Sequence, residues 1–436
     1  MTVPCFLFVI GKPKCVANIC AVADFLVYLS YSFVPVAWQG VFQIRFTMKI
    51  VSRYLFSVCL LVLVSVCFAR CSNKSSESKY AQLGTLLPLD ETELVSDIGP
   101  YVDEVRLVPI TNRNEALMSY VSKAVLDESG NIFILDIEGN VVALKPDGTL
   151  LRKVANKGRG PKEYLNVEDI AVSSDGKYLM VLDGAKLRCY GLTDTTLYKE
   201  IDVLRSEFPV DAFAPAGGDD VYLFGAFPAS REDYGKSKPM LLLTDSKGRK
   251  KREYLPRKDF TVSICNITQV FGNGYILKPQ DSEHVVYKLY PDSVSAYCKV
   301  DFGKKNIPAN YDGGKTQIDV GEYMTAPYFK LPMFFQETAD DLYFKAAGPD
   351  ADGYNFLYSK DKKRGIHWVD SREASPLNFI ASDDTYFYAV VSKQLLSGSD
   401  DVCPLTKYIA DAIRLDSGSD SAGGDNDVIV KIKFKL

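Results

Sequence analysis

Residues 123–203 contain the same succession of short apolar runs and glycine turns twice. In the first copy, runs at 123–127 and 131–136 flank a turn that contains Gly130, and in the second copy runs at 168–173 and 177–183 flank a turn that contains Gly176. The two glycines are 46 residues apart, a period typical of one blade of a β-propeller. The repeat therefore predicts an all-β fold made of similar, radially arranged sheets.

Each copy holds four strand-like runs, which is the number in one propeller blade. They lie at 123–127, 131–136, 140–145 and 149–155, and at 168–173, 177–183, 186–190 and 197–203. Later copies are less regular, but turn residues precede apolar runs at 217–220, 272–274, 339–341 and 382–384. These six turns predict a six-bladed β-propeller, with seven blades as the alternative.

A propeller has to close, because an open last blade leaves unpaired strand edges. The runs at 103–110 and 427–435 read as strands that belong to no blade of their own. We therefore expect the N- and C-terminal strands to share the last blade, with a short amphipathic helix at 405–413 between its strands.

The N-terminal region predicts export. Residues 48–70 are a short basic segment followed by an apolar run, the order of a signal peptide. Cys71 and the serine-rich residues after it resemble a bacterial lipoprotein signal, in which the cysteine is lipidated, although Arg70 stands where a small residue is usual. We interpret 1–47 as a mis-called N-terminal extension and 71–100 as a flexible tether before the propeller domain at 101–436. The rival interpretation of the first residues is a membrane hairpin with a span at 16–37.

The charge and the cysteine spacing argue against nucleic-acid binding and against a cysteine metal site. Residues 1–71 hold six of the 51 basic groups and one of the 55 acidic groups, so the rest of the chain has a net charge of −9. Such a body repels nucleic acid. Four cysteines follow Cys71, and their spacing is not that of metal ligands: Cys189, Cys265, Cys298 and Cys403. They could form a disulfide or remain buried free thiols.

The loop between the first two units reads Gly158-Arg-Gly-Pro-Lys-Glu-Tyr164. Here the chain resembles a group of secreted six-bladed propellers of Gram-negative bacteria, related to the NHL and TolB-like propellers, which carry a Gly-x-Gly-Pro-x-Glu-[Tyr/Phe] loop. The resemblance covers about residues 100–436 and implies the fold, while most members have no assigned activity. In this interpretation Gly158, Gly160 and Pro161 shape the turn and Tyr164 packs between blades.

Chemistry-bearing residues are few. Arg159, Lys162 and Glu163 are the candidate ligand-binding residues, because loops on that face of a propeller commonly form a binding funnel. Asp136 and Asp183 end equivalent strands and are candidate channel carboxylates, which could hold calcium. His284 and His367 have no catalytic motif around them, and we interpret both as packing or surface histidines.

These observations lead to one leading hypothesis and one alternative. The leading hypothesis is a non-enzymatic, monomeric binding propeller without cofactor or metal, held by lipid at Cys71 in the periplasm or outer membrane of a Gram-negative cell. Its ligand is expected to be a glycan, a peptide or an envelope protein, not nucleic acid, and its contact with the membrane only the lipid. The alternative is a calcium-type hydrolase or lyase that uses Asp136 and Asp183.

Overall fold

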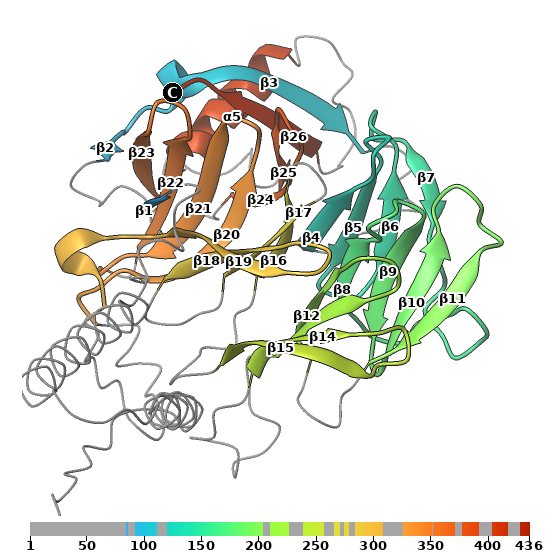
Figure 1. Ribbon diagram of the computed structural model, residues 1–436. Coiled ribbons are helices and arrows are strands. Elements are labelled where there is room, and N and C mark those ends of the chain that lie inside the picture. The colour runs from blue at the N-terminus through green and yellow to red at the C-terminus, as the bar shows by residue number, and fades with distance from the viewer. Residues whose placement is uncertain are drawn as a thin grey trace, which may run out of the picture. The chain divides into compact units, whose positions relative to one another are not determined.

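The computed structural model describes residues 84–85, 92–110, 120–203, 210–225, 239–256, 266–270, 274–278, 284–307, 326–350, 352–370, 377–391, 403–416 and 428–436. They belong to one compact unit, Ser75–Leu436. Six sheets, each with four antiparallel strands, follow one another in a ring (Figure 1). The fold is a six-bladed β-propeller, so the predicted fold class is confirmed and the seven-bladed alternative is wrong. The interpretations of residues 1–71 fall outside the described residues.

Blades 1 and 2 correspond to the two sequence repeats. Blade 1 contains β4 (Val121–Leu126), β5 (Ile132–Asp136), β6 (Val141–Leu144) and β7 (Leu150–Lys153). Blade 2 contains β8 (Val167–Val172), β9 (Tyr178–Asp183), β10 (Lys186–Gly191) and β11 (Tyr198–Asp202). All eight strands lie where the repeats predict them. The turn glycines Gly130 and Gly176 have φ angles of 78° and 66°, a backbone conformation that glycine adopts without steric cost.

Blades 3 to 5 repeat the same order of strands from inside to outside. Blade 3 contains β12 (Ala212–Pro215), β13 (Val221–Phe224), β14 (Pro239–Thr244) and β15 (Lys250–Pro256). Blade 4 contains β16 (Asn266–Val270), β17 (Gly274–Lys278), β18 (Val285–Leu289) and β19 (Val294–Lys299), and a 3-10 turn, η6 (Gly303–Lys305), follows it. Blade 5 contains β20 (Lys330–Glu337), β21 (Asp341–Ala347), β22 (Gly353–Ser359) and β23 (Arg364–Asp370).

Both ends of the propeller domain build blade 6. Its order is β24 (Phe379–Ser382), β25 (Phe387–Val391), β26 (Val428–Phe434) and β3 (Val102–Pro109). The C-terminal β26 pairs antiparallel with the N-terminal β3 from Val428 opposite Pro109 to Phe434 opposite Val102. The chain between β25 and β26 includes the helix α5 (Pro404–Asp416), which contacts β3 and β23. The predicted closure by terminal strands and the predicted helix are confirmed.

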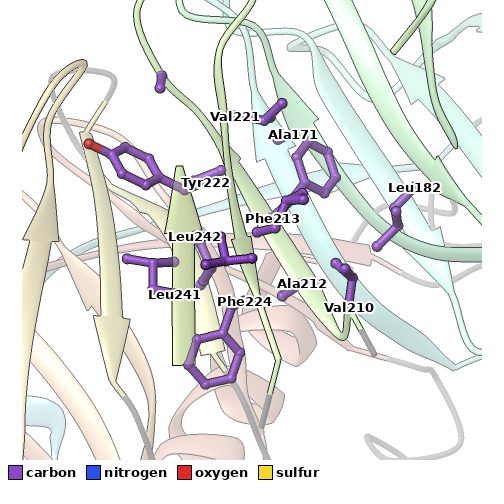
Figure 2. Packing of buried hydrophobic residues seen from close by; sticks show 14 of the residues in the cluster. Ala171, Leu182, Val210, Ala212, Phe213, Val221, Tyr222, Phe224, Leu241 and Leu242 are labelled. Carbon is purple, nitrogen blue, oxygen red and sulfur yellow. The ribbon is translucent and has the colours of Figure 1, made fainter. Parts of the chain in front are cut away.

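The innermost strands form a ring around the axis. Each first strand contacts the first strand of the next blade, and β24 contacts β4 to complete the circle. Apolar side chains fill the spaces between neighbouring sheets, since both faces of a blade are covered. Figure 2 shows this packing for blades 2 and 3, where Leu182, Phe213 and Leu242 belong to one buried cluster.

One glutamine fastens the ring across its axis. The Gln269 side chain on β16 accepts a hydrogen bond from the Leu126 amide and donates one to the Leu126 carbonyl, both at 2.9 Å. Leu126 ends β4, so this side chain joins blade 4 to blade 1 on the other side of the ring. Tyr275 adds a second cross-link by donating to the Val172 carbonyl of blade 2 at 2.9 Å. We call the Gln269–Leu126 pair the axial brace.

The segment before the propeller also pairs with it. β1 (Gly84–Thr85) adds in parallel to β19, and β2 (Glu93–Leu94) adds in parallel to β23. Val95 and Ile98 are buried among residues of blades 5 and 6, and η3 (Gly99–Tyr101) leads into β3. These residues lie within the range that the sequence predicts to be a flexible tether. Where the structure describes that range, it is part of the folded domain.

Three of the late cysteines are buried free thiols: Cys189, Cys298 and Cys403. Burial raises the pKa of each thiol above its usual value, which keeps it protonated and unreactive near neutral pH. Cys265 lies outside the described residues. No helix in the described ranges combines the length and apolar character needed to cross a membrane.

Asp341, which begins β21, gives the propeller a predicted pH dependence. Its side chain is buried, and burial followed by the neighbouring Asp340 raises its pKa to about 6 from 3.8. The folded state binds a proton in this window that the unfolded state does not, so stability falls as pH rises from about 4 to about 6. We expect Asp341→Asn to raise the free energy of unfolding by about 2 to 3 kcal/mol at pH 7.5 and by much less at pH 4. Urea unfolding at both pH values measures this, and an equal effect at both would contradict it.

Candidate functional site

The sequence-predicted site residues lie on one side of the propeller, at the junction of blades 1 and 2. Tyr120 precedes β4, the turn 137–140 joins β5 to β6, and the loop 154–166 joins β7 to β8. These three segments meet: the Ile137 amide donates to the Tyr120 carbonyl at 2.9 Å, and Lys157 Nζ donates to the Glu138 carbonyl at 2.9 Å. We call this surface the inlet face, because the innermost strands begin there.

Glu163 organises the glycine-rich loop. Its Oε2 accepts a hydrogen bond from the Gly160 amide at 2.7 Å. A Cβ atom at Gly158 would overlap this carboxylate, and a Cβ at Gly160 would lie 2.8 Å from it. Neither glycine has a positive φ, whereas Lys162 does, at 64°. Besides their expected place in the turn, the two glycines therefore leave space for the Glu163 side chain.

Tyr164 and Lys162 wedge the loop between the two blades. The Tyr164 ring is 1% exposed and packs with residues of both blades, and its hydroxyl accepts a hydrogen bond from the Val141 amide at 3.2 Å. The Lys162 carbonyl accepts a hydrogen bond from the Tyr190 hydroxyl at 3.0 Å, and Lys162 Nζ lies 5.6 Å from the centre of the Tyr198 ring. Both residues thus attach the loop to its own scaffold.

Of the three candidate ligand-binding residues, Arg159 alone is left for an external partner. Glu163 and Lys162 are engaged within the loop and with blade 2, as described above. Arg159 is exposed, and its guanidinium has no polar partner among the described residues. An exposed guanidinium offers five donors in a planar fork to a carboxylate.

The two candidate channel carboxylates bind their own backbone. Asp136 is 2% exposed, and its Oδ1 accepts hydrogen bonds from the Glu138 and Asn140 amides at 3.0 and 2.8 Å. Such a contact closes the turn in the manner of an Asx turn.

Asp183 has the same place in blade 2 but different partners. It accepts hydrogen bonds from the Asn166 and Leu165 amides at 3.0 and 3.2 Å, and Arg188 Nε lies 2.7 Å from its Oδ2. Burial alone would raise the pKa of Asp183. The hydrogen bonds from the two amides and from Arg188 outweigh burial, so the pKa lies below its usual value. No three His, Cys, Asp or Glu side chains lie close enough to hold a metal ion in the described part of the chain.

Both histidines lie away from the inlet face residues and are buried. Burial lowers the pKa of His284 to about 3 and that of His367 to about 4, so both are neutral at pH 7. His367 Nδ1 lies 2.8 Å from Thr92 Oγ1 in the segment that precedes the propeller. Trp368 is fully buried between blades 5 and 6 and offers no surface for stacking on a sugar.

Sequence reasoning missed the exposed apolar residues of the inlet face. Tyr120, Ile137 and Leu165 are 61%, 66% and 47% exposed. Ile137 bonds to Tyr120 through the backbone, and Gly139 of the same turn lies against Val167, two residues after Leu165, so all three residues lie on the inlet face. We call these three residues the apolar cluster. The sequence could have indicated them, because large apolar side chains in a turn or just before a strand cannot be buried between the sheets of neighbouring blades.

The inner strands also contain a buried ion pair that the sequence analysis did not name. Lys123 on β4 lies 2.5 Å from Asp169 on β8, and the other carboxylate oxygen of Asp169 accepts a hydrogen bond from the Phe213 amide of β12 at 3.0 Å. Burial raises the pKa of Asp169, while Lys123 and the amides oppose that rise. The pair therefore joins blades 1, 2 and 3 near the axis, and its role is structural.

The packing of Glu163 against the glycines makes a testable prediction. We expect Glu163→Ala to lower the free energy of unfolding by about 1 kcal/mol, because the Gly160 amide loses its acceptor. Gly158→Ala is expected to lower the free energy of unfolding more in the natural chain than in the Glu163→Ala variant. Only the natural chain has the Glu163 carboxylate where the new Cβ atom would lie. A double-mutant cycle measured by urea unfolding gives the coupling, and additive effects would show that the carboxylate does not occupy this space.

Comparisons with other proteins find similar structures and a matching family. A Bacteroides fragilis protein described as "Putative exported protein" is similar in structure, with a TM-score of 0.61 and 17% identity over 81% of this chain and 99% of that one. A Bacteroides vulgatus member of the DUF4221 family has a TM-score of 0.46 and 11% identity over 77% of this chain and 97% of that one. No curated protein matches the sequence. Residues 90–400 match the family described as "Domain of unknown function (DUF4934)", and the chain therefore belongs to this family.

Proposed function

We propose that this protein is a non-enzymatic binding propeller of the cell envelope, and that it binds a protein or peptide partner on the inlet face of blades 1 and 2. The observation that carries the proposal is the apolar cluster, in which Tyr120, Ile137 and Leu165 are about half exposed or more. Single exposed apolar residues are common, but a group of them marks an interaction site. Arg159 on the same loop supplies the charge that would fix the orientation of the partner.

The composition of the surface favours a protein partner over a glycan. Sugars stack on flat aromatic rings, whereas two of the three cluster residues are aliphatic. Tyrosine and arginine beside aliphatic side chains are typical of protein interfaces. For the alternative function, a calcium-type hydrolase or lyase, the oxygens of Asp136 and Asp183 would have to leave the amides that they now bind. No contact among the described residues favours that alternative.

The proposed location is the periplasm or the outer membrane, with a lipid on Cys71. The apolar run before Cys71 supports export, and so does the name of the similar Bacteroides fragilis protein. Labelling of growing cells with radioactive palmitate tests the anchor: the natural chain should incorporate the label and Cys71→Ala should not. Equal labelling of both would refute lipidation at this residue.

Site-specific photo-crosslinking in cells tests the binding face. A photoreactive phenylalanine analogue replaces Ile137 or Leu165 in the full chain, and replaces Ser174, an exposed residue of the opposite face, in the control. We expect one protein adduct of the same mass from positions 137 and 165 and none from position 174. Purified partner should then bind the natural chain and bind Ile137→Asp at least about tenfold more weakly, since a core contact of an interface is worth more than 1 kcal/mol. Adducts at position 174 alone, or equal affinity of Ile137→Asp, would reject the inlet face.

A further inference from the structure

The outer edges of the blades can accept an added strand. In blades 4 and 5 the outermost strands, β19 and β23, are each extended in parallel by a two-residue strand from the segment before the propeller. Gly84 pairs with Cys298 and Glu93 pairs with Ile366. The rim geometry of this propeller therefore permits the backbone pairing on which strand addition depends.

Blade 3 presents the longest outermost strand of the first three blades. β15 has seven residues, against four in β7 and five in β11. It pairs with β14 on one side, and within the described ranges no strand pairs with its other edge. Residues 250–253 are exposed in succession, so side chains on both faces of this strand lie in solvent. The outer edge of β15 is therefore accessible to solvent over residues 250–253.

This edge carries the densest positive charge in the sequence. Residues 247–252 read Lys-Gly-Arg-Lys-Lys-Arg. Three of the cations have acidic neighbours, since Arg249 contacts Asp245, Lys250 contacts Glu253 and Lys251 contacts Asp220. The Lys247 ammonium has no acidic neighbour among the described residues, and Arg252 donates to the Asp292 carbonyl. Asp292 also acts electrostatically on Arg252, so five cations lie beside four acids, and the edge keeps one net positive charge on a body that is negative as a whole.

We propose that the edge of β15 binds an extended acidic segment of a partner protein, which adds to blade 3 as a fifth strand. The backbone of β15 would supply the hydrogen bonds, and the cations of 247–252 would select for glutamate and aspartate side chains. Lysines on an edge strand can instead serve to prevent pairing between sheets, and that role predicts no binding of any strand. This surface is separate from the inlet face, so the proposal stands independently of the proposed function.

Binding of a synthetic peptide to the purified full-length protein tests this proposal. The probe is a ten-residue peptide of alternating glutamate and valine, and its control has the same charge but proline in place of every valine, which prevents strand pairing. We expect the first peptide to bind and to protect the amides of 250–255 from hydrogen exchange, and the proline peptide to bind at least about tenfold more weakly. Binding should weaken as salt is raised, because the charges are exposed.

Charge reversal on two blades provides the matched variants. Lys247→Glu with Lys251→Glu should reduce the affinity about tenfold or more. Lys145→Glu with Lys153→Glu makes the same change in net charge at the equivalent turn and outer strand of blade 1, where the lysines are also exposed, and should leave the affinity unchanged. Equal binding of both peptides, no protection of 250–255, or equal loss in both variants would overturn the proposal. An unaltered far-ultraviolet circular dichroism spectrum shows that each variant is folded.

Discussion

Val430→Asp is expected to lower the free energy of unfolding by about 4 kcal/mol or more, or to prevent folding. Val430 is fully buried in β26, where it pairs with Ala389 on one side and with Leu107 on the other. An aspartate there would have to bury a carboxylate without a partner, and it would do so in the strand that joins the two ends of the domain. Thermal and urea unfolding, followed by circular dichroism, measure the loss.

Lys433→Ala on the same strand is the matched control for Val430→Asp. Lys433 forms an ion pair of 2.9 Å with Asp103, in which both side chains are about 40% exposed. Exposed pairs contribute about 0 to 1 kcal/mol, so this variant should unfold almost like the natural chain. A Val430→Asp protein that is as stable as Lys433→Ala would contradict closure of the ring by β3 and β26.

Asp169→Ala is expected to cost about 3 to 5 kcal/mol, because it removes one partner of a buried ion pair. The Lys123 ammonium would lose a carboxylate oxygen at 2.5 Å, and the Phe213 amide would lose its acceptor at 3.0 Å. Three blades would therefore lose a shared contact. Urea unfolding measures the effect.

The double variant Lys123→Met with Asp169→Leu tests whether the loss comes from the stranded charge. Replacing a whole buried pair by apolar residues of similar volume is often neutral, so we expect the double variant to recover much of the stability lost in Asp169→Ala. If the double variant is as unstable as Asp169→Ala, the Phe213 contact rather than the ammonium accounts for the loss.

The blades could be predicted from the sequence to the extent that their turns are regular. In blades 1 and 2 a glycine with positive φ stands at each central turn, and all strands fall where the repeat places them. In blade 5 the pairing of β20 with β21 is interrupted between Lys330 and Met333 and again between Met333 and Gln336. Irregularities of this kind break the alternation of apolar and polar residues, so only the turn at 339–341 indicated this blade.

The short strands before the propeller could not be predicted for a different reason. β1 and β2 have two residues each, and a periodicity cannot be read from two residues. Their pairing depends on the outer edges of blades 4 and 5, which are more than 200 residues away along the chain.

The candidate site was chosen from the sequence by its loop motif, but the contacts within it could not be predicted. The loop motif placed Arg159 on the inlet face, but the sequence could not show that the Glu163 carboxylate fills the space above Gly158 and Gly160, because that contact depends on how the loop folds back. The apolar cluster joins Tyr120, Ile137 and Leu165 from three segments. The packing of blade 1 against blade 2 places all three on one face.

The axial brace has a consequence for how such a protein can diversify. Since Gln269 ties two opposite blades together through main-chain atoms of Leu126, widening the centre of the ring would break both of its amide hydrogen bonds. Selection for a new partner is therefore expected to act on residues such as Ile137 and Arg159 at the surface, where a substitution leaves the hub undisturbed. Relatives that recognise different molecules should then share a rigid middle and differ in their rims and loops.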